Sequence, residues 1–472
     1  MWFSKKKLWE VKNYNNILDF FRKKLNMWFF IKFCIIFFSL WLIYIYASSA
    51  IDFSKWVFKN VSKSVVKTIS QTVWEEMKED ELGQVNILLL GYWWKNHQWG
   101  YLSDTIIIAS FNPKLGATTF LSIPRDLYVS DKELGYAWKI NWLFAISYMK
   151  YKDYDRAVAT LTSKLKEITW VDINYYALID FQWFKKFVDK LGGVDVDVPY
   201  DLVDTQYPNE NWGYETFRIS KGPHHLDGAT ALKYARSRHS TSDFSRALRQ
   251  QQIIKWILND VMKLWNLTDI NKMKEIYNEY NNMVETNISF KNILWMAKYL
   301  DKVTNFYSFV YSADCDNRSY KTTEPWCFLY YPPREQFNGM STLLPIGASA
   351  WKVSYYKYLQ NFSFIVVYEQ KFLLENAKIK VLNWLDKKNK KYRKTTPASD
   401  TAILLKKNWL NITDIWDAPT VYQKTTLFKN GTWDYEGTID VLKMLVNIDE
   451  ILTWDSYQGS WNDLTLVIWN DF

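Results

Sequence analysis

Short apolar runs alternate with helix-like segments between residues 84 and 264, and this alternation is the strongest constraint on the fold. The runs with the length of strands are Val85–Gly91, Thr105–Phe111, Thr118–Ile123, Ile173–Ile179 and Val194–Val198. The segments with helical character are Trp142–Ile168, Phe181–Leu191 and Phe244–Leu264. Several runs are almost continuously apolar, which is typical of strands buried on both faces of a sheet. The sequence therefore predicts an α/β layered domain in which helices cover a central sheet.

The length of 472 residues exceeds one usual domain of roughly 100–200 residues. Residues 265–305 are polar and helix-prone, so we expect them to extend the first domain, which then covers residues 84–305. Residues 306–362 are richer in Tyr, Pro and Gly and are interpreted as a loop-rich connection. A second, small α/β domain is predicted at residues 363–472, with strands at Ile379–Leu382, Ile412–Ile415 and Leu464–Ile468 and helices at Ala398–Leu405 and Tyr435–Val446.

The N-terminal region combines a basic arm with a long apolar segment. Residues 1–27 hold seven Lys or Arg and two acidic residues, whereas Met27–Ala50 has Lys32 as its only charge. About 20 apolar residues cross a bilayer, so residues 28–50 predict one transmembrane helix with a cytoplasmic N-terminus. Residues 51–83 would then link this anchor in the cell membrane to an extracytoplasmic domain. A cleaved signal peptide is the alternative, because Ala47–Ala50 has small residues at the spacing of a cleavage site.

The net charge of +9 does not indicate nucleic-acid binding. Residues 1–27 account for +5, which leaves only +4 for the rest of the chain and is too dilute for a surface that follows phosphates. Three cysteines and four histidines also offer little for a zinc site. Outside the cytoplasm, Cys315 and Cys327 are free to form a disulfide across a gap of eleven residues.

Tryptophan is unusually frequent in this chain, and glycine is unusually rare. There are 26 Trp and 15 Gly, so Gly makes up about 3% of the residues against a usual value of about 7%. Trp93, Trp94 and Trp99 lie in an expected turn, and Trp409 ends an expected helix, which are positions typical of glycine. We hypothesise that many of these Trp are UGA codons of a genetic code that reads UGA as glycine. The alternative is an aromatic-rich secreted protein.

Arginine and aspartate residues lie at the ends of the apolar strands of the first domain or follow them. They are Asp104 in Ser-Asp-Thr, Arg125 and Asp126 in Ser-Ile-Pro-Arg-Asp, Arg236 and Arg238 in Tyr-Ala-Arg-Ser-Arg-His, and Asp243, Arg246, Arg249 and Gln250 in Asp-Phe-Ser-Arg-Ala-Leu-Arg-Gln. Guanidinium groups match phosphate oxygens with planar forks of donors, and carboxylates hold a bridging divalent cation. Together these residues predict a pyrophosphate site, although a surface ion pair explains any one of them about equally well.

Seven motifs between residues 84 and 260 resemble those of the LytR-CpsA-Psr family of cell-envelope glycopolymer transferases. They are SDTIIIASFNPK, LSIPRD, KIN, INYYALIDFQWF, LGGVDVDVP, LDGATALKYARSRH and DFSRALRQQQ. The last hundred residues, with KVLNWLD near the start and LVIWNDF at the end, resemble the C-terminal domain often appended to this family. The resemblance implies a three-layer α/β/α domain with a mixed central sheet, a membrane anchor and an extracytoplasmic location.

The same resemblance implies an activity. Family members transfer a polyprenyl-pyrophosphate-linked glycopolymer to peptidoglycan with the help of Mg²⁺ and form a phosphodiester. By motif, the residues that would hold the pyrophosphate are Arg125, Arg236, Arg238, Arg246 and Gln250, with help from Lys139. Asp104 would hold the magnesium, and the catalytic set would be Asp104, Arg125, Arg236 and Arg238. The residues expected to support this set are Asp126, Asp243 and Arg249.

Two departures from the family pattern concern the metal. Most members have an Asp two residues after the position of Gly91, where this chain has Trp93. They also have an Arg two residues before Asp104, where this chain has Leu102. One metal ligand is therefore missing, and His97 is a poor substitute because a lone histidine in a loop is more often solvated.

Two other functions fit the same residues. A polyprenyl-pyrophosphate phosphatase would use the same arginines and Mg²⁺ with water as the nucleophile. A non-catalytic protein that binds or regulates the cell wall is suggested by the missing aspartate and the appended domain. The transferase and the phosphatase both require an apolar groove for the lipid; helix Phe181–Leu191 is a candidate, but core packing explains its apolar residues equally well.

Overall fold

The computed structural model describes residues 75–92, 100–208, 213–238, 243–265, 274, 277–278, 284–299, 303, 305–313, 327–383, 397–418, 422–430, 434–454 and 463–469. The predicted basic arm, the predicted transmembrane segment at 28–50, His97 and Cys315 lie outside these residues. Among the helices that are described, none has both the length and the apolar character required to cross a membrane.

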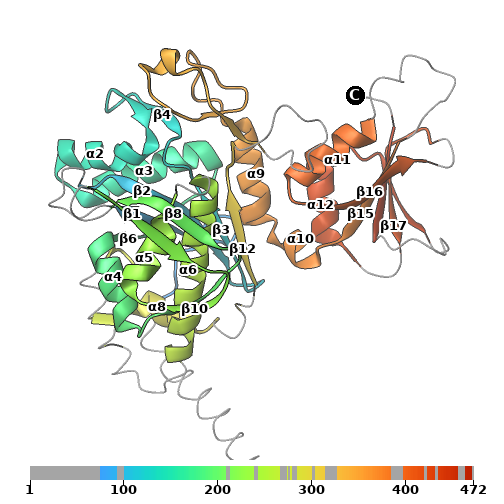
Figure 1. Ribbon diagram of the computed structural model, residues 1–472. Helices are drawn as coiled ribbons and strands as arrows, with labels where there is room; N and C mark the ends of the chain where they lie inside the picture. Colours follow the sequence, from blue (N-terminus) through green and yellow to red (C-terminus); the bar gives the residue numbers. More distant parts are fainter. Residues whose placement is uncertain are drawn as a thin grey trace, which may run out of the picture. The chain divides into compact units, whose positions relative to one another are not determined.

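A mixed sheet forms the centre of the first domain (Figure 1). In the described part of the chain it has six strands in the order β11-β6-β1-β2-β3-β12. Their bounds are β1 Val85–Tyr92, β2 Ser103–Asn112, β3 Ala117–Ser122, β6 Tyr175–Asp180, β11 Glu285–Thr286 and β12 Asn305–Val310. β2 pairs antiparallel with β1 and β3, whereas β6 and β12 add parallel to β1 and β3. The mixed α/β fold expected from the sequence is therefore confirmed.

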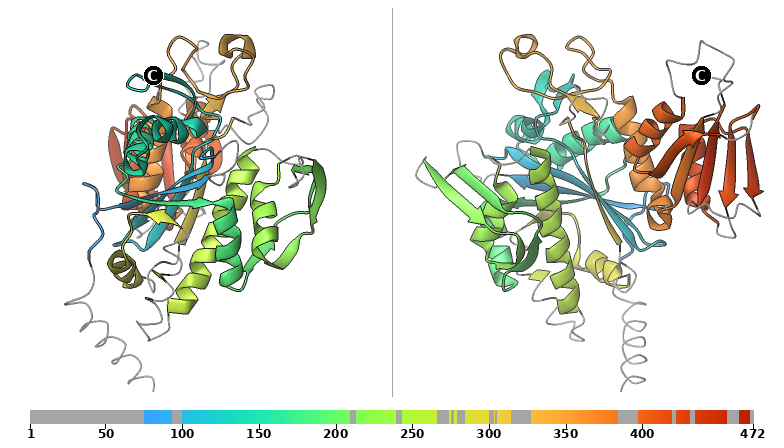
Figure 2. Two further views of the ribbon diagram at one scale, coloured as in Figure 1. Left: turned by 90° about the vertical axis from the view of Figure 1, so that its left-hand side faces the viewer. Right: turned by 45° about the vertical axis from the view of Figure 1, so that its right-hand side comes forward.

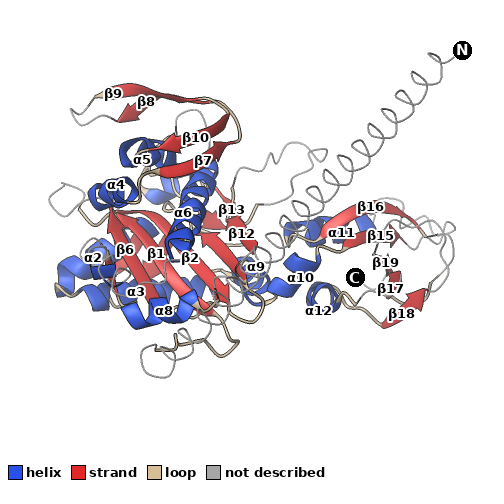
Figure 3. Ribbon diagram, turned by 90° about the horizontal axis from the view of Figure 1, so that it is seen from below, coloured by secondary structure: helices blue, strands red, loops and turns tan. Residues whose placement is uncertain are grey.

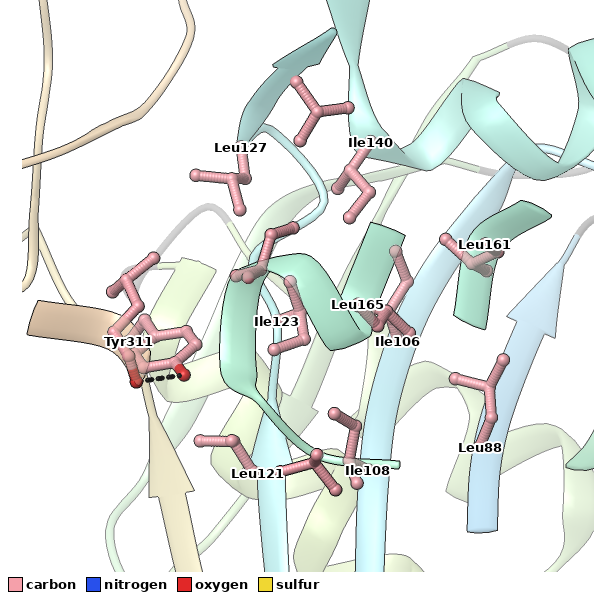
Figure 4. Close-up of a cluster of buried hydrophobic side chains, with 14 of the residues drawn as sticks. Leu88, Ile106, Ile108, Leu121, Ile123, Leu127, Ile140, Leu161, Leu165 and Tyr311 are labelled. Atoms are coloured by element: carbon pink, nitrogen blue, oxygen red, sulfur yellow. Dashed lines mark hydrogen bonds between the residues drawn. The ribbon is translucent and has the colours of Figure 1, made fainter. Parts of the chain in front are cut away.

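Helices cover both faces of this sheet (Figure 2). On one face, α2 (Leu143–Tyr151), α3 (Tyr154–Thr169) and α9 (Lys357–Tyr368) enclose a hydrophobic core with apolar side chains of β1, β2 and β3 (Figure 4). On the other face, α6 (Asp243–Trp265) crosses the sheet, and the buried Gln251 amide donates to the carbonyl oxygen of Phe309 at 2.9 Å. The apolar run of β2 is buried throughout because both faces are covered.

The segment expected to form one helix at Trp142–Ile168 forms two. α2 ends at Tyr151, and Lys152 takes a left-handed conformation with φ of 56°. Asp153 then caps α3, because its side chain accepts a hydrogen bond from the backbone N–H of Arg156 at 3.1 Å. The expected single helix is therefore divided in two, because the Asp153 side chain caps the start of α3 instead of continuing α2.

A smaller layer of helices and strand pairs is attached to the same domain (Figure 3). It comprises α4 Phe181–Lys190, α5 Gly228–Arg236, β7 Val194–Val198 with β10 Gly222–Leu226, and β8 Leu202–Pro208 with β9 Tyr214–Ile219. α4 and α5 approach closely at Gly228, where a Cβ would lie 2.1 Å from the carbonyl oxygen of Lys185. A larger residue there would push the start of α5 away from α4.

Two elements of residues 306–362 belong to the first domain rather than to a connection. β12 extends the central sheet, and α9 contributes buried side chains to its core. The rest of this region is irregular, with β13 Leu329–Tyr330, β14 Leu344–Pro345 and the 3₁₀ turn Arg334–Phe337. A second hairpin, β4 Tyr128–Asp131 with β5 Tyr136–Lys139, is followed by the 3₁₀ turn Ile140–Trp142. Cys327 is disulfide-bonded, but pairing with Cys315 stays a prediction.

The second domain contains a sheet of its own, with order β16-β15-β19-β17-β18 in the described residues. The bounds are α10 Gln370–Glu375, β15 Lys378–Asn383, α11 Pro397–Lys407, β16 Asn411–Asp417, β17 Thr426–Asn430, α12 Glu436–Leu445, β18 Glu450–Trp454 and β19 Leu464–Ile468. Apolar residues of α11, α12, β15 and β19 form its core. The C-terminal region is therefore a small α/β domain.

Two of the tryptophans adopt left-handed backbone conformations at helix ends. Trp170 follows α3 with φ of 60°, and Trp409 follows α11 with φ of 65°. Leu410 and Trp409 donate backbone hydrogen bonds to the carbonyl oxygens of Leu405 and Lys406, which is the pattern of a Schellman motif. Glycine usually occupies the left-handed position of such motifs because a Cβ is strained there. Trp409 therefore agrees with the glycine position expected from the sequence, and Trp170 is a second position of the same kind.

Candidate active site

Asp104 and Arg125 come together at one end of the central sheet. Asp104 lies near the start of β2, and Arg125 follows β3 in the turn after Ile123 and Pro124. The backbone N–H of Ile123 donates to the carbonyl oxygen of Ile106, so the turn is held against β2. An ion pair of 2.6 Å joins Arg125 Nη1 to Asp104 Oδ1. The sheet register therefore determines the position of both charged groups.

The C-terminal end of α5 supplies Arg236 and Arg238. The guanidinium of Arg236 stacks 4.7 Å from the Phe181 ring centre, and its Nη1 lies 3.4 Å from the Tyr207 hydroxyl. The backbone N–H of Arg238 donates to Asp204 Oδ2 at 2.9 Å. These contacts fix the direction in which the chain leaves α5.

Arg246 and Gln250 are four residues apart on α6 and therefore lie on the same face of the helix. Arg246 is buried, and the amide of Gln250 donates to the carbonyl oxygen of Ala235 at 3.4 Å. Both lie in the N-terminal half of α6, whose partial positive charge favours a bound anion at the first turn. Asp243 begins α6, and its expected supporting role stays a prediction.

These side chains meet in one cavity of about 140 Å³. The described residues that line it are Asp104, Arg125, Phe181, Asp204, Tyr207, Pro208, Arg236, Arg238, Arg246 and Gln250. Four guanidinium groups thus face two carboxylates, which gives the lining an excess of positive charge. The volume is below the roughly 300–1,000 Å³ of pockets that bury a drug-sized ligand. The cavity therefore suits a small polyanionic group rather than a whole polymer.

Three of the residues predicted from sequence lie beside the cavity rather than on its surface. Lys139 forms an ion pair of 2.7 Å with Asp126, and Asp126 lies 3.8 Å from Arg125 Nε. Arg249 is buried and donates from Nε to the carbonyl oxygen of Tyr234 at 3.0 Å. In this structure Asp126 lies between Lys139 and Arg125, and Arg249 contacts α5.

Four lining residues, Phe181, Asp204, Tyr207 and Pro208, were not among the predicted site residues. Asp204 and Tyr207 belong to β8, a short strand without an apolar run, and Phe181 had been considered only for a lipid groove. Burial raises the pKa of Tyr207, although the nearby Arg236 cation opposes this effect. The Tyr207 hydroxyl therefore stays protonated at neutral pH. The sequence signal for it was weak because β8 lies far from the arginine motifs along the chain.

The described residues contain no group of three or more His, Cys, Asp or Glu side chains arranged to hold a metal ion. Asp104 is one carboxylate at the cavity, and the residues around Trp93 and His97 lie outside the described part. A single carboxylate still fits Mg²⁺, since this ion commonly takes one or two protein carboxylates and completes its shell with phosphate oxygens and water.

The chain also matches a known protein family. Residues 52–318 match the LytR_cpsA_psr family. The chain belongs to this family. This match confirms the membership that the sequence motifs predicted. The matched residues include all four arginines that line the cavity.

Relatives within the LytR_cpsA_psr family include two teichoic acid transferases. One is the polyisoprenyl-teichoic acid–peptidoglycan teichoic acid transferase TagV of Bacillus subtilis, to which the chain is 34% identical over 190 residues. These aligned residues make up 39% of this chain and 45% of TagV. It is 30% identical over 259 residues to TagU of Bacillus anthracis, with coverage of 53% and 78%. The chain therefore spans about half the length of TagV. The crystal structure of B. subtilis TagV covers 59% of this chain and 96% of its own, with 26% identity and a TM-score of 0.43.

Proposed function

We propose that this protein transfers a polyprenyl-pyrophosphate-linked glycopolymer to peptidoglycan. The observation that carries the proposal is the convergence of Arg125, Arg236, Arg238 and Arg246 with Asp104 on one cavity. These residues come from two stretches of sequence, 104–125 and 236–246, that are more than a hundred residues apart, which argues against incidental surface ion pairs. TagU and TagV are teichoic acid transferases, which supports an anionic glycopolymer as the group transferred.

The proposed reaction is a phosphoryl transfer. A sugar hydroxyl of peptidoglycan attacks the phosphorus that carries the glycan, a new P–O bond forms, and the bond to the bridging oxygen breaks. Polyprenyl phosphate leaves, and the hydroxyl proton passes to a base. Such transfers need mainly positioning and neutralisation of charge on the phosphate oxygens. The four guanidinium groups would supply both, because each presents fixed donors to those oxygens.

Asp104 is the proposed ligand of Mg²⁺. When bound, the ion would neutralise charge on the pyrophosphate oxygens. The ion pair with Arg125 at 2.6 Å keeps the Asp104 carboxylate beside the place that those oxygens would occupy. Lys139 and Asp126 would support the site indirectly, because Lys139 pairs with Asp126 and Asp126 contacts Arg125.

Phe181, Tyr207 and Pro208 form the apolar part of the cavity lining. We propose that the first carbons of the prenyl chain lie against these residues, next to the pyrophosphate. The proposed location is the outer side of the cell membrane, with residues 28–50 as the anchor and residues 1–27 in the cytoplasm. Reporter fusions placed after residue 50 and at the N-terminus would test this orientation.

The test of the proposed function uses the full-length chain with a polyprenyl-pyrophosphate-linked teichoic acid precursor, with and without peptidoglycan. Polymer linked to peptidoglycan through phosphate, formed only when the acceptor is present, is the expected product. Free phosphate without acceptor would instead indicate the phosphatase. Arg125→Ala should stop transfer, whereas Arg218→Ala, an exposed arginine on β9 outside the cavity lining, should not. If Arg125→Ala leaves attachment unchanged, the protein is not this transferase.

A further inference from the structure

The last residue of α5 and the turn after it carry two of the four cavity arginines, and a buried carboxylate binds this turn. Asp204 is 1% exposed and lies on β8. Its Oδ2 accepts hydrogen bonds from Ser237 Oγ at 2.8 Å and from the Arg238 backbone N–H at 2.9 Å. Its Oδ1 accepts from the backbone N–H of Gln206 at 3.0 Å. Asp204 therefore connects β8 to the segment between Arg236 and Arg238.

Arg249 binds the same turn from the side of its carbonyl groups. It is 3% exposed and donates from Nε to the carbonyl oxygen of Tyr234, and from Nη2 to that of Ser237. The last carbonyls of a helix lack partners within the helix, and a cation at this end also interacts favourably with the helix dipole. Asp204 thus accepts hydrogen bonds from the N–H and O–H groups of this segment, and Arg249 donates hydrogen bonds to its carbonyl oxygens.

We propose that Asp204 is a positioning residue of the phosphate site, with Arg249 as its counterpart on the other side of the turn; this rests on the proposed function. The reason is electrostatic. A carboxylate beside an anion site repels the anion, and among the described residues Asp204 and Asp104 are the two that bring this repulsion into the cavity. Asp204 therefore favours phosphate binding only by orienting Arg236 and Arg238.

A role as a metal ligand is the competing explanation for Asp204. Both of its oxygens already accept hydrogen bonds from protein donors at 2.8–3.0 Å, which is the arrangement of a structural anchor. A ligand to Mg²⁺ would instead keep one oxygen directed at the ion and its phosphate partners. The two roles differ in how substitution changes the requirement for Mg²⁺.

The test measures binding of inorganic pyrophosphate to the full-length chain by calorimetry, with and without Mg²⁺. If charge alone mattered, Asp204→Asn would remove repulsion and strengthen binding. If Asp204 orients Arg236 and Arg238, the same substitution should instead weaken binding and raise the dissociation constant of pyrophosphate about tenfold. The Mg²⁺ concentration that gives half of its full effect on binding should stay unchanged. Asp201→Asn is the matched control, because this exposed residue near the start of β8 accepts from the Lys221 backbone N–H away from the cavity and should leave binding unchanged.

Ser237→Ala keeps the buried charge and removes one of the hydrogen bonds to Asp204, so it decides the question if Asp204→Asn does not fold. We expect a rise in the dissociation constant of about threefold in a protein that still folds but has a lower unfolding midpoint. Binding equal to or tighter than that of the unaltered chain in the folded variants, or an altered Mg²⁺ requirement in Asp204→Asn, overturns the positioning role while the site stands. If the unaltered chain binds no pyrophosphate, the proposed function fails as well.

Discussion

Arg125 reaches back across the sheet to Asp104, and the two side chains form an ion pair of 2.6 Å although they are 21 residues apart. Their exposed fractions are only 16% for Arg125 and 12% for Asp104, so solvent screens the pair less than it would an exposed one. Each group orients the other at the cavity. A change at either residue therefore alters two groups of the site.

Asp104→Asn tests the proposed metal-binding role. The amide keeps the size of the side chain but removes its charge, so both the hold on Arg125 and the attraction for Mg²⁺ weaken. We expect transfer to fall by about 100-fold, comparable with loss of one transition-state donor in other enzymes, and its stimulation by Mg²⁺ to disappear. The measurement is the initial rate of polymer attachment over a Mg²⁺ titration.

Asp126→Asn serves as the control for Asp104→Asn. Asp126 pairs with Lys139 at 2.7 Å and is not among the residues that line the cavity. A smaller loss with the Mg²⁺ response intact is expected. If Asp104→Asn retained the full Mg²⁺ response, the assignment of Asp104 as the metal ligand would be wrong.

Arg236→Ala and Arg238→Ala should each lower transfer by about 10- to 100-fold, since a hydrogen bond to a charged group contributes about 1.5–3 kcal/mol. Arg236→Ala also removes stacking on Phe181 at 4.7 Å, which predicts a loss in the free energy of unfolding of about 1 kcal/mol. Arg236→Lys keeps the charge but not the planar stacking, and should recover only part of the activity. Product yields and urea unfolding curves measure both effects. Unchanged yield in both alanine variants would remove these residues from the site.

Much of the central sheet follows from the sequence because its strands are continuous apolar runs. β1 and β3 begin and end within one residue of the predicted runs, and β19 of the second domain matches Leu464–Ile468 at both ends. The hairpin of β8 and β9 was not predicted, because buried and exposed residues do not alternate regularly along either strand. Without that alternation, the sequence does not show that the two strands pair. β12 was missed for a related reason: its aromatic residues are typical of loops as well as strands.

The site was predictable where its residues occur in compact motifs. Arg236, Arg238, Arg246 and Gln250 lie within fifteen residues of one another along the chain, so their convergence required only two helices. Asp204 was not predictable in this way, because its contacts with Ser237 and Arg238 span more than thirty residues. A lone aspartate in a short strand carries no local signal of such a contact.

Buried tyrosines predict that the protein loses stability at alkaline pH. Burial raises the pKa of Tyr311 above its ordinary value and that of Tyr234 to about 12. In the unfolded chain these phenols ionise near pH 10, whereas the folded chain keeps their protons. Their contribution to stability is therefore complete below about pH 10 and is lost as the pH rises through the folded pKa values. Urea unfolding between pH 7 and pH 11 measures this decrease.

Tyr311→Phe isolates the effect of one of these groups. It removes the hydrogen bond from the Tyr311 hydroxyl to the carbonyl oxygen of Leu359 at 3.1 Å, so stability at pH 7 should fall by about 1 kcal/mol. The decrease above pH 10 should nevertheless be shallower than in the unaltered chain, because one ionisable group is gone. Identical slopes in the two proteins would show that Tyr311 does not contribute to the alkaline transition.

The left-handed backbone at Trp170 and Trp409 predicts that glycine is the better residue at both positions. The side chains are 51% and 55% exposed, and a non-glycine residue in this conformation costs about 1–2 kcal/mol. Trp170→Gly should raise the free energy of unfolding by about 1 kcal/mol, and Lys152→Gly, with φ of 56°, calibrates the gain at another helix end. Trp409→Gly should raise it less, because it also removes the edge-to-face contact with the Phe309 ring at 4.9 Å. If the tryptophans arise from codons read as glycine, the gene has UGA at positions 170 and 409. UGG at both would show that these two tryptophans are genuine, and UGG at Trp94, Trp138, Trp183 and Trp384 as well would end the miscoding hypothesis, whatever the stability measurements give.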